Sequence, residues 1–184
     1  GANRMFKTIL HDKSFYTEKG QKELNALLET RSKIFPSPKS PWLISALAQT
    51  STESQDLILD FFAGSGTTGE AVMRLNAEDG GNRQFILVQI PQPIDPKKQK
   101  EAHSFVTQTL GKPEATIFEI TAERLRRAGD KINAAQRSQG KPEVDAGFRV
   151  YTLADDPHAL VHRTPLDQAT QADVTALQTA IATP

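Results

Sequence analysis

Apolar residues along the chain follow two spacings, which predict alternating helices and strands. Leucines recur at helical spacing in residues 17–29, and the apolar stretch 42–49 follows a proline that suits the first helical position. Two compact apolar runs, 57–61 and 85–90, predict buried parallel strands. A glycine-rich loop and a helix lie between these runs, so the region predicts a strand–helix–strand unit with a parallel sheet.

The flanking regions carry weaker patterns. Residues 35–41 hold three prolines and predict an extended loop, because each proline disfavours helix at the residue before it. Thr116 and Glu119 form a capping-box pattern ahead of a long amphipathic helix. Other short elements are expected from local pattern alone: a strand at 6–10, a short helix within 102–110, a strand at 147–153 and a terminal helix at 169–181.

Composition narrows the class of protein. The 184 residues carry 22 basic and 22 acidic side chains, and this neutral balance fits poorly with a stand-alone nucleic-acid binder. The absence of cysteine excludes disulfides, thiolate metal sites and cysteine nucleophiles. The four histidines have no ligand spacing, so no metal site is expected. No apolar run reaches the roughly 20 residues of a membrane helix and no signal peptide is visible, so we expect a cytoplasmic protein.

The glycine-rich loop carries the strongest chemical signal. Gly64, Gly66 and Gly69 fit the pattern G-x-G-x-x-G, with a helix expected from Thr68 or Gly69. Glycines also occur in plain strand-to-helix turns, but here strand, loop and helix follow in the right order for a cofactor site. The pattern alone allows a dinucleotide or S-adenosylmethionine. Asp60 ends the preceding strand, where its carboxylate would repel a pyrophosphate and attract the ammonium group of a methionine.

Two further features favour the methyl donor. In dinucleotide sites the first glycine directly follows the strand, whereas three residues separate Asp60 from Gly64. An acidic residue is also expected at the end of the second strand, where this chain has Gln89 and Gln92. A nicotinamide-dependent oxidoreductase therefore remains only a third hypothesis.

These residues resemble a specific family. The segment 59–91 closely resembles the modification subunits of type III restriction-modification systems. Those subunits are adenine-N6 DNA methyltransferases of the class in which the cofactor motif follows the catalytic motif. The resemblance extends to 33–44, which looks like the family's proline-lysine motif, and downstream to 123–132 and 147–153. It implies an α/β chain with a partial Rossmann-like, S-adenosylmethionine-dependent methyltransferase fold, a parallel sheet and flanking helices in three layers.

The resemblance also implies roles for individual residues. The loop backbone would wrap the methionine part of the cofactor, Asp60 and Phe61 would line the pocket, and Pro38 and Lys39 would close it. Gln92 stands where the family usually has an acidic residue that holds the ribose, and glutamine lacks the charge assistance. The expected cofactor-binding set is Pro38, Lys39, Asp60, Phe61, Phe62, Ala63, Gly64, Ser65, Gly66, Thr67, Thr68, Gln89 and Gln92.

The catalytic residues of such an enzyme are missing. The family's Asp/Asn-Pro-Pro-aromatic tetrapeptide, which would accept a flipped adenine, does not occur in the chain. Only 56 residues precede Leu57, too few for the tetrapeptide and a recognition region. We therefore expect an inactive C-terminal half of a longer subunit, divided into an extension at 1–34, a cofactor-binding core at 35–153 and a tail at 154–184.

The expected partners follow from this interpretation. They are the missing N-terminal catalytic half, DNA in the intact enzyme, a restriction subunit and a second copy of the chain, with no membrane contact. The alternative is a non-catalytic S-adenosylmethionine-binding module that completes a split enzyme. The cluster of Arg124, Arg126 and Arg127 could contact phosphates, but such runs are more often the solvated face of a helix, which we prefer.

Overall fold

The computed structural model describes residues 12–153, 170–172 and 175. The chain divides into two compact units, Gly1–Gly147 and Phe148–Pro184, which are treated separately. In chain order the first unit contains η1 (Lys13–Phe15), α1 (Thr17–Leu27), α2 (Pro41–Ser51), β1 (Leu57–Asp60), α3 (Thr67–Asp79), β2 (Gln84–Leu87), α4 (Lys100–Ser104), the π-helical segment η2 (Phe105–Thr109) and α5 (Ile117–Ser138).

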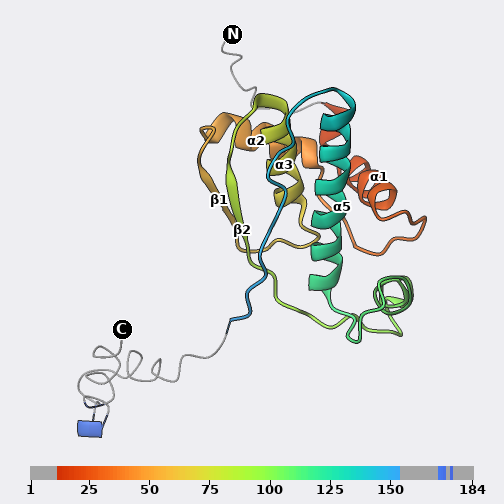
Figure 1. The fold of residues 1–184 in the computed structure, drawn as a ribbon. Helices are drawn as coiled ribbons and strands as arrows, with labels where there is room; N and C mark the ends of the chain where they lie inside the picture. Colours follow the sequence, from red (N-terminus) through yellow and green to blue (C-terminus); the bar gives the residue numbers. More distant parts are fainter. Residues whose placement is uncertain (1–11, 154–169, 173–174, 176–184) are drawn as a thin grey trace. The chain divides into compact units, whose positions relative to one another are not determined.

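The predicted strand–helix–strand unit is confirmed. Strands β1 and β2 pair in parallel, with Leu57 opposite Gln84 and Asp60 opposite Leu87. Helix α3 connects them and ends at Gly80, whose left-handed backbone (φ 73°) closes the helix as glycine does at this position. Among the described residues the sheet has these two strands. The fold is thus mixed α/β with a small parallel sheet (Figure 1).

Helices cover one face of this sheet. Figure 1 shows α3 and α5 beside the two strands, and the packing around Gly69 confirms the contact. A Cβ at Gly69 would lie 2.5 Å from Leu125 Cδ2 on α5 and 3.2 Å from Leu87 Cδ1 on β2. Glycine is therefore needed there because α5 and the sheet approach α3 so closely.

The opposite face of the sheet is open, which corrects one expectation. The strands were predicted to be buried, yet Leu57, Leu59 and Ile86 are 56%, 49% and 48% exposed. An unbroken apolar run is typical of a strand covered on both faces. The described residues supply only the inner cover, so the expected third layer is not present among them.

The N-terminal segment packs into the main core. Helix α1 runs as predicted, and a Cβ at Gly20 would lie 2.5 Å from the carbonyl oxygen of Pro38, so α1 presses directly on the proline-rich segment. Pro41 occupies the first turn of α2, also as predicted. The core cluster consists of residues from α1, the loop after it, the segment between β2 and α4, then α4, η2 and α5: Leu24, Leu28, Ile34, Ile94, Ala102, Phe105, Val106 and Ile120.

Four other predictions are wrong or concern residues outside those that the structure describes. Thr116 precedes α5, but its side chain makes no capping bond, and Glu119 pairs instead with Lys112 at 3.2 Å. Residues 147–153 form no strand, since partial alternation without a partner strand does not make a ladder. The strand expected at 6–10 lies outside the described residues, as does most of the helix expected at 169–181. No helix among the described residues is long and apolar enough to span a membrane.

Candidate functional site

The glycine-rich loop forms a tight turn between β1 and α3. Gly64 and Gly66 have left-handed backbones, with φ of 53° and 81°. L-residues with side chains rarely adopt this region, so both glycines are required by conformation. The amide of Gly66 donates to the carbonyl of Ala63 at 2.8 Å, and Gly66 then caps α3. The first amides of α3 have no acceptor within the helix and form a positive end suited to an anion.

Asp60 braces this loop from the end of β1. Its Oδ1 accepts a hydrogen bond from the amide of Phe62 at 2.9 Å, and its Oδ2 accepts from Thr68 Oγ1 at 2.5 Å. The side chain is half-buried. A carboxylate oxygen has more than one acceptor position, so Asp60 can hold the loop and still accept a hydrogen bond from a ligand cation.

Gln89 fastens the same loop to the end of β2. Its Oε1 accepts a hydrogen bond from the Gly64 amide at 2.7 Å, and its Nε2 donates to the carbonyl of Ile90 at 2.9 Å. The Ala63 amide also donates to the carbonyl of Val88 at 3.1 Å. The carboxyl ends of both strands therefore meet at the loop, the place where open α/β sheets bind ligands.

The proline-rich segment lies against the other side of the loop. Thr67 Oγ1 is 3.4 Å from the carbonyl oxygen of Lys39, and a Cβ at Gly64 would lie 3.3 Å from Phe35 Cζ. Pro38 is buried, whereas Lys39 is exposed. The structure thus brings together Pro38, Lys39 and the loop, which the sequence had joined only through the family resemblance.

The remaining candidates are more peripheral. Phe61 and Phe62 are exposed on the loop, Phe62 to 89%. Gln92 is also exposed, and its carbonyl accepts a hydrogen bond from the Ile117 amide at 3.0 Å, which ties its backbone to the start of α5. These three side chains are accessible to a ligand rather than engaged in packing. No group of three or more His, Asp or Glu placed to hold a metal occurs among the described residues.

Sequence reasoning missed Arg124. The arginine cluster was assigned to a solvated helix face, which is wrong for this member, because Arg124 is 0% exposed. Arg126 is exposed and Arg127 half-buried. The signal was present in the spacing, since Arg124 lies four residues after Ile120 and four before Ala128, both buried on α5.

Arg124 pairs with the buried carboxylate of Glu70 at 2.8 Å. Burial pushes the pKa of Glu70 upward, but the charge of Arg124 and the hydrogen bonds and charge of Arg74 outweigh it and lower that pKa below its ordinary value. For Arg124 burial acts in the other direction and lowers the pKa, because it disfavours the charged guanidinium, while the negative charge of Glu70 partly offsets this. The lowered pKa of Glu70 favours its carboxylate form, and the pair lies under the glycine loop.

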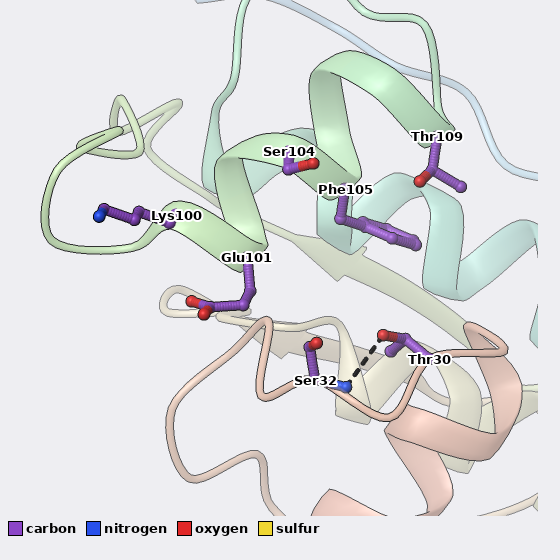
Figure 2. Close-up of a pocket in the computed structure, with 7 residues that line it drawn as sticks. All are labelled: Thr30, Ser32, Lys100, Glu101, Ser104, Phe105 and Thr109. Atoms are coloured by element: carbon purple, nitrogen blue, oxygen red, sulfur yellow. Dashed lines mark hydrogen bonds between the residues drawn. The ribbon is translucent and has the colours of Figure 1, made fainter.

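A hollow of about 380 Å³ lies elsewhere, between the segment after α1 and the α4–η2 region. Figure 2 shows its walls, with the amide of Ser32 donating to Thr30 Oγ1 on one side and the α4–η2 residues on the other. Its lining contains no residue of the glycine loop: Thr30, Ser32, Lys100, Glu101, Ser104, Phe105 and Thr109. The candidate site is therefore the loop rather than this polar depression.

Similarity to known proteins agrees with this location. The DNA methylase family model matches residues 2–92, a range that includes β1, the loop, α3 and β2. The EcoPI type III Mod subunit of Escherichia phage P1 is 37% identical over 155 residues, or 84% of this chain and 22% of that subunit. The StyLTI type III Mod subunit of Salmonella typhimurium is 36% identical over 137 residues, which cover 74% of this chain and 19% of that subunit.

A methyltransferase of another type is also similar. The type II methyltransferase M.KpnI of Klebsiella pneumoniae is 42% identical over 88 residues, or 48% of this chain and 21% of the enzyme. The chain spans about a fifth of the length of these relatives. The chain is therefore a homologue of the Mod subunits of type III restriction-modification enzymes, and its residues 2–92 match the DNA methylase family.

Proposed function

We propose that this chain is the S-adenosylmethionine-binding part of an adenine-N6 DNA methyltransferase of a type III restriction-modification system. The observation that carries the proposal is the glycine loop, fixed between Asp60, Gln89 and the Lys39 segment. The loop falls within the range that matches the DNA methylase family. The same strand–loop–helix–strand order supports a partial Rossmann-like fold as part of the proposal.

The residues at the loop fit the chemistry of this cofactor. The first turn of α3 suits the methionine carboxylate, because a helix N-terminus attracts anions. The carboxylate of Asp60 suits the ammonium group. The exposed rings of Phe61 and Phe62 offer apolar surface to the adenine, and Gln92 offers hydrogen bonds to the ribose. When bound, S-adenosylmethionine supplies the reactive methyl group, while these residues bind and orient the molecule.

The open sheet face supports a role within a larger subunit. Leu57, Leu59 and Ile86 are about half exposed, and the chain spans about a fifth of its relatives. Uncovered apolar surface of this kind favours a partner. The proposed occupant is the remainder of the subunit, which carries the Asp/Asn-Pro-Pro-aromatic tetrapeptide and the DNA recognition region. The intact subunit then acts on DNA beside a restriction subunit, whereas this chain alone transfers no methyl group.

The alternative, a non-catalytic module that completes a split enzyme, draws on the same open face. Both functions need cofactor binding by this chain, and they differ in where the catalytic residues reside. If the coding sequence continues upstream in frame into the tetrapeptide, the first is correct. If the chain is produced on its own and stimulates methyl transfer by a separate polypeptide, the second is correct.

Calorimetric titration of the purified 184-residue chain tests the binding step. Saturable binding of S-adenosylmethionine and no binding of NAD are expected. Asp60→Asn can still accept from the Phe62 amide through Oδ1 and donate from Nδ2 to the Thr68 hydroxyl, which reverses that second bond, but it removes the charge. It should therefore weaken binding by about tenfold or more, as loss of one hydrogen bond to a charged group does. Asp56→Asn, a matched change just before β1, should leave the dissociation constant unchanged. Binding of NAD, or no binding of S-adenosylmethionine, would contradict the proposal.

A further inference from the structure

Arg124 connects helix α5 to the glycine loop through its guanidinium group. Nη1 donates to Ser65 Oγ at 2.6 Å and to Thr67 Oγ1 at 2.7 Å, while Nε donates to Glu70 Oε2 at 2.8 Å. The side chain is completely buried. One residue of α5 therefore holds both the loop and the first turn of α3.

Glu70 fixes the orientation of this guanidinium. Its Oε1 accepts a hydrogen bond from Arg74 at 2.7 Å, and its Oε2 faces Arg124. Both oxygens of the carboxylate are thus engaged, and the planar guanidinium is held by Nε on one edge. This leaves Nη1 directed at Ser65 and Thr67, a geometry that depends on the fork shape of arginine.

The neighbouring residues of α5 extend the same contact. Thr121 Oγ1 donates to the carbonyl of Gly64 at 2.5 Å, and a Cβ at Gly66 would lie 3.1 Å from Thr121 Cγ2. Thr121 and Arg124 lie on one side of the helix, three residues apart. Together they contact the four consecutive residues of the turn, 64–67.

The hydrogen bonds continue to the far side of the site. Thr67 Oγ1 accepts from Arg124 and lies 3.4 Å from the carbonyl oxygen of Lys39. Arg124 therefore also orients the hydroxyl that links the loop to the proline-lysine segment. The glycine loop and the proline-lysine segment, which the family resemblance places on two sides of the cofactor, are therefore both connected to this one buried side chain.

Stability alone is a poor explanation for a buried arginine here. Nη2 is buried and has no hydrogen-bond partner among the described residues, and a buried unpaired donor is destabilising. Ion pairs in protein interiors are often replaced by apolar residues without loss of stability. A residue that is costly to bury, yet aimed at the loop, points to a role in the shape of the site.

We propose that Arg124 is a positioning residue for cofactor binding, which fixes Ser65 and Thr67 so that the loop backbone keeps the shape that receives S-adenosylmethionine. The inference rests on the proposed function of the loop. Arg124 does not itself touch the cofactor, because its atoms are covered by the loop and by α3.

The test compares Arg124→Met with Leu28→Ala, a change in the core cluster away from the loop. Two quantities are measured in the 184-residue chain below the melting temperature of both variants. The first is the amide hydrogen-exchange rate of residues 64–68 without ligand. The second is the dissociation constant for S-adenosylmethionine. Exchange is expected to rise about tenfold in Arg124→Met, equivalent to about 1.4 kcal/mol, and the dissociation constant by a similar factor. Leu28→Ala should change neither by more than about twofold, well under that 1.4 kcal/mol step.

A second variant keeps the test decisive if Arg124→Met does not fold. Arg124→Lys retains a positive charge beside Glu70. Lysine lacks the planar guanidinium, so it cannot donate to Glu70, Ser65 and Thr67 in the same fixed geometry. It should lose less thermal stability and still speed exchange in the loop. Loop exchange and affinity that match the wild type in both arginine variants would overturn the inference, as would equal effects in Leu28→Ala.

The outcomes separate this inference from the proposed function. If the wild-type chain binds S-adenosylmethionine and every folded arginine variant matches it in affinity and in loop exchange, the inference fails while the proposed function stands. If the wild-type chain binds no S-adenosylmethionine, the proposed function fails together with the cofactor part of the inference. The exchange measurement needs no ligand, so it still decides whether Arg124 fixes the loop.

Discussion

The two faces of the β1–β2 sheet differ in how completely this chain builds them. The inner face packs on α3 and α5, and beside it lie a buried ion pair and a braced glycine loop. The outer face presents Leu57, Leu59 and Ile86 to solvent. The difference is that the described residues cover the apolar inner face with helices, whereas they leave the apolar side chains of the outer face about half exposed.

The largest effect is expected from removing the charge of Glu70. Glu70→Gln leaves Arg124 buried beside a neutral partner, which should lower the free energy of unfolding by about 3–5 kcal/mol. Glu78→Gln, at an exposed position of the same helix, should change it by less than about 0.5 kcal/mol. Urea unfolding measures both. A loss below 1 kcal/mol for Glu70→Gln would show that the inner face does not depend on the ion pair.

Replacing one leucine that packs on the inner side of the sheet and one on its outer face by alanine compares the two sides directly. Leu125→Ala on α5, where the side chain is 4% exposed, should cost about 2–5 kcal/mol of unfolding free energy. Leu59→Ala, at 49% exposure, should cost less than about 1.5 kcal/mol, since only part of the side chain is buried. Equal losses in urea unfolding would mean that the outer face is covered in solution.

The ion pair also predicts that the free energy of unfolding falls at acid pH. The pKa of Glu70 is lowered in the folded chain, so at acid pH the unfolded chain binds more protons and stability rises with pH. The contribution of Glu70 is therefore complete above the ordinary pKa of an unfolded glutamate and is lost as the pH falls through the lower folded pKa. Urea midpoints between pH 6 and pH 3 should fall more steeply in the wild type than in Glu70→Gln. Parallel pH profiles would contradict the assignment.

The smallest effect on stability is expected from a charge on the outer face. Ile86→Lys should change the free energy of unfolding by less than about 1 kcal/mol, because the side chain is 48% exposed and a lysine stem can lie along the sheet. It should also reduce binding of a dye that reports apolar surface. If the covering part of the subunit is added, the variant should bind it more weakly than the wild type does.

Local patterns in the sequence predicted the centre of the fold but not its surroundings. The glycine at position 66 permits the left-handed turn that the loop makes, and the apolar runs on either side make strands, so β1, the loop, α3 and β2 were all predictable. The open face was not predictable, because an apolar run has the same pattern whichever chain segment covers it. Pairing decides a strand, and residues 147–153 have no partner strand among the described residues.

The candidate site shows the same division. Asp60 and the glycines are adjacent in sequence, so their proximity was predictable from one motif. Arg124 reaches the loop from a helix that begins more than fifty residues later, within a run of arginines that suggested a solvated face. Its partner Glu70 carries no local signal of burial. Helical spacing from Ile120 could have placed Arg124 inward, but not against Ser65.

Backbone amide exchange of the 184-residue chain, measured with and without S-adenosylmethionine, tests the central claim most directly. The proposed cofactor site predicts protection confined to Lys39, residues 60–68, Gln89 and Gln92, with no protection in the hollow near Thr30 and Lys100. Protection of that hollow, of the outer sheet face alone, or of no segment at all would contradict it.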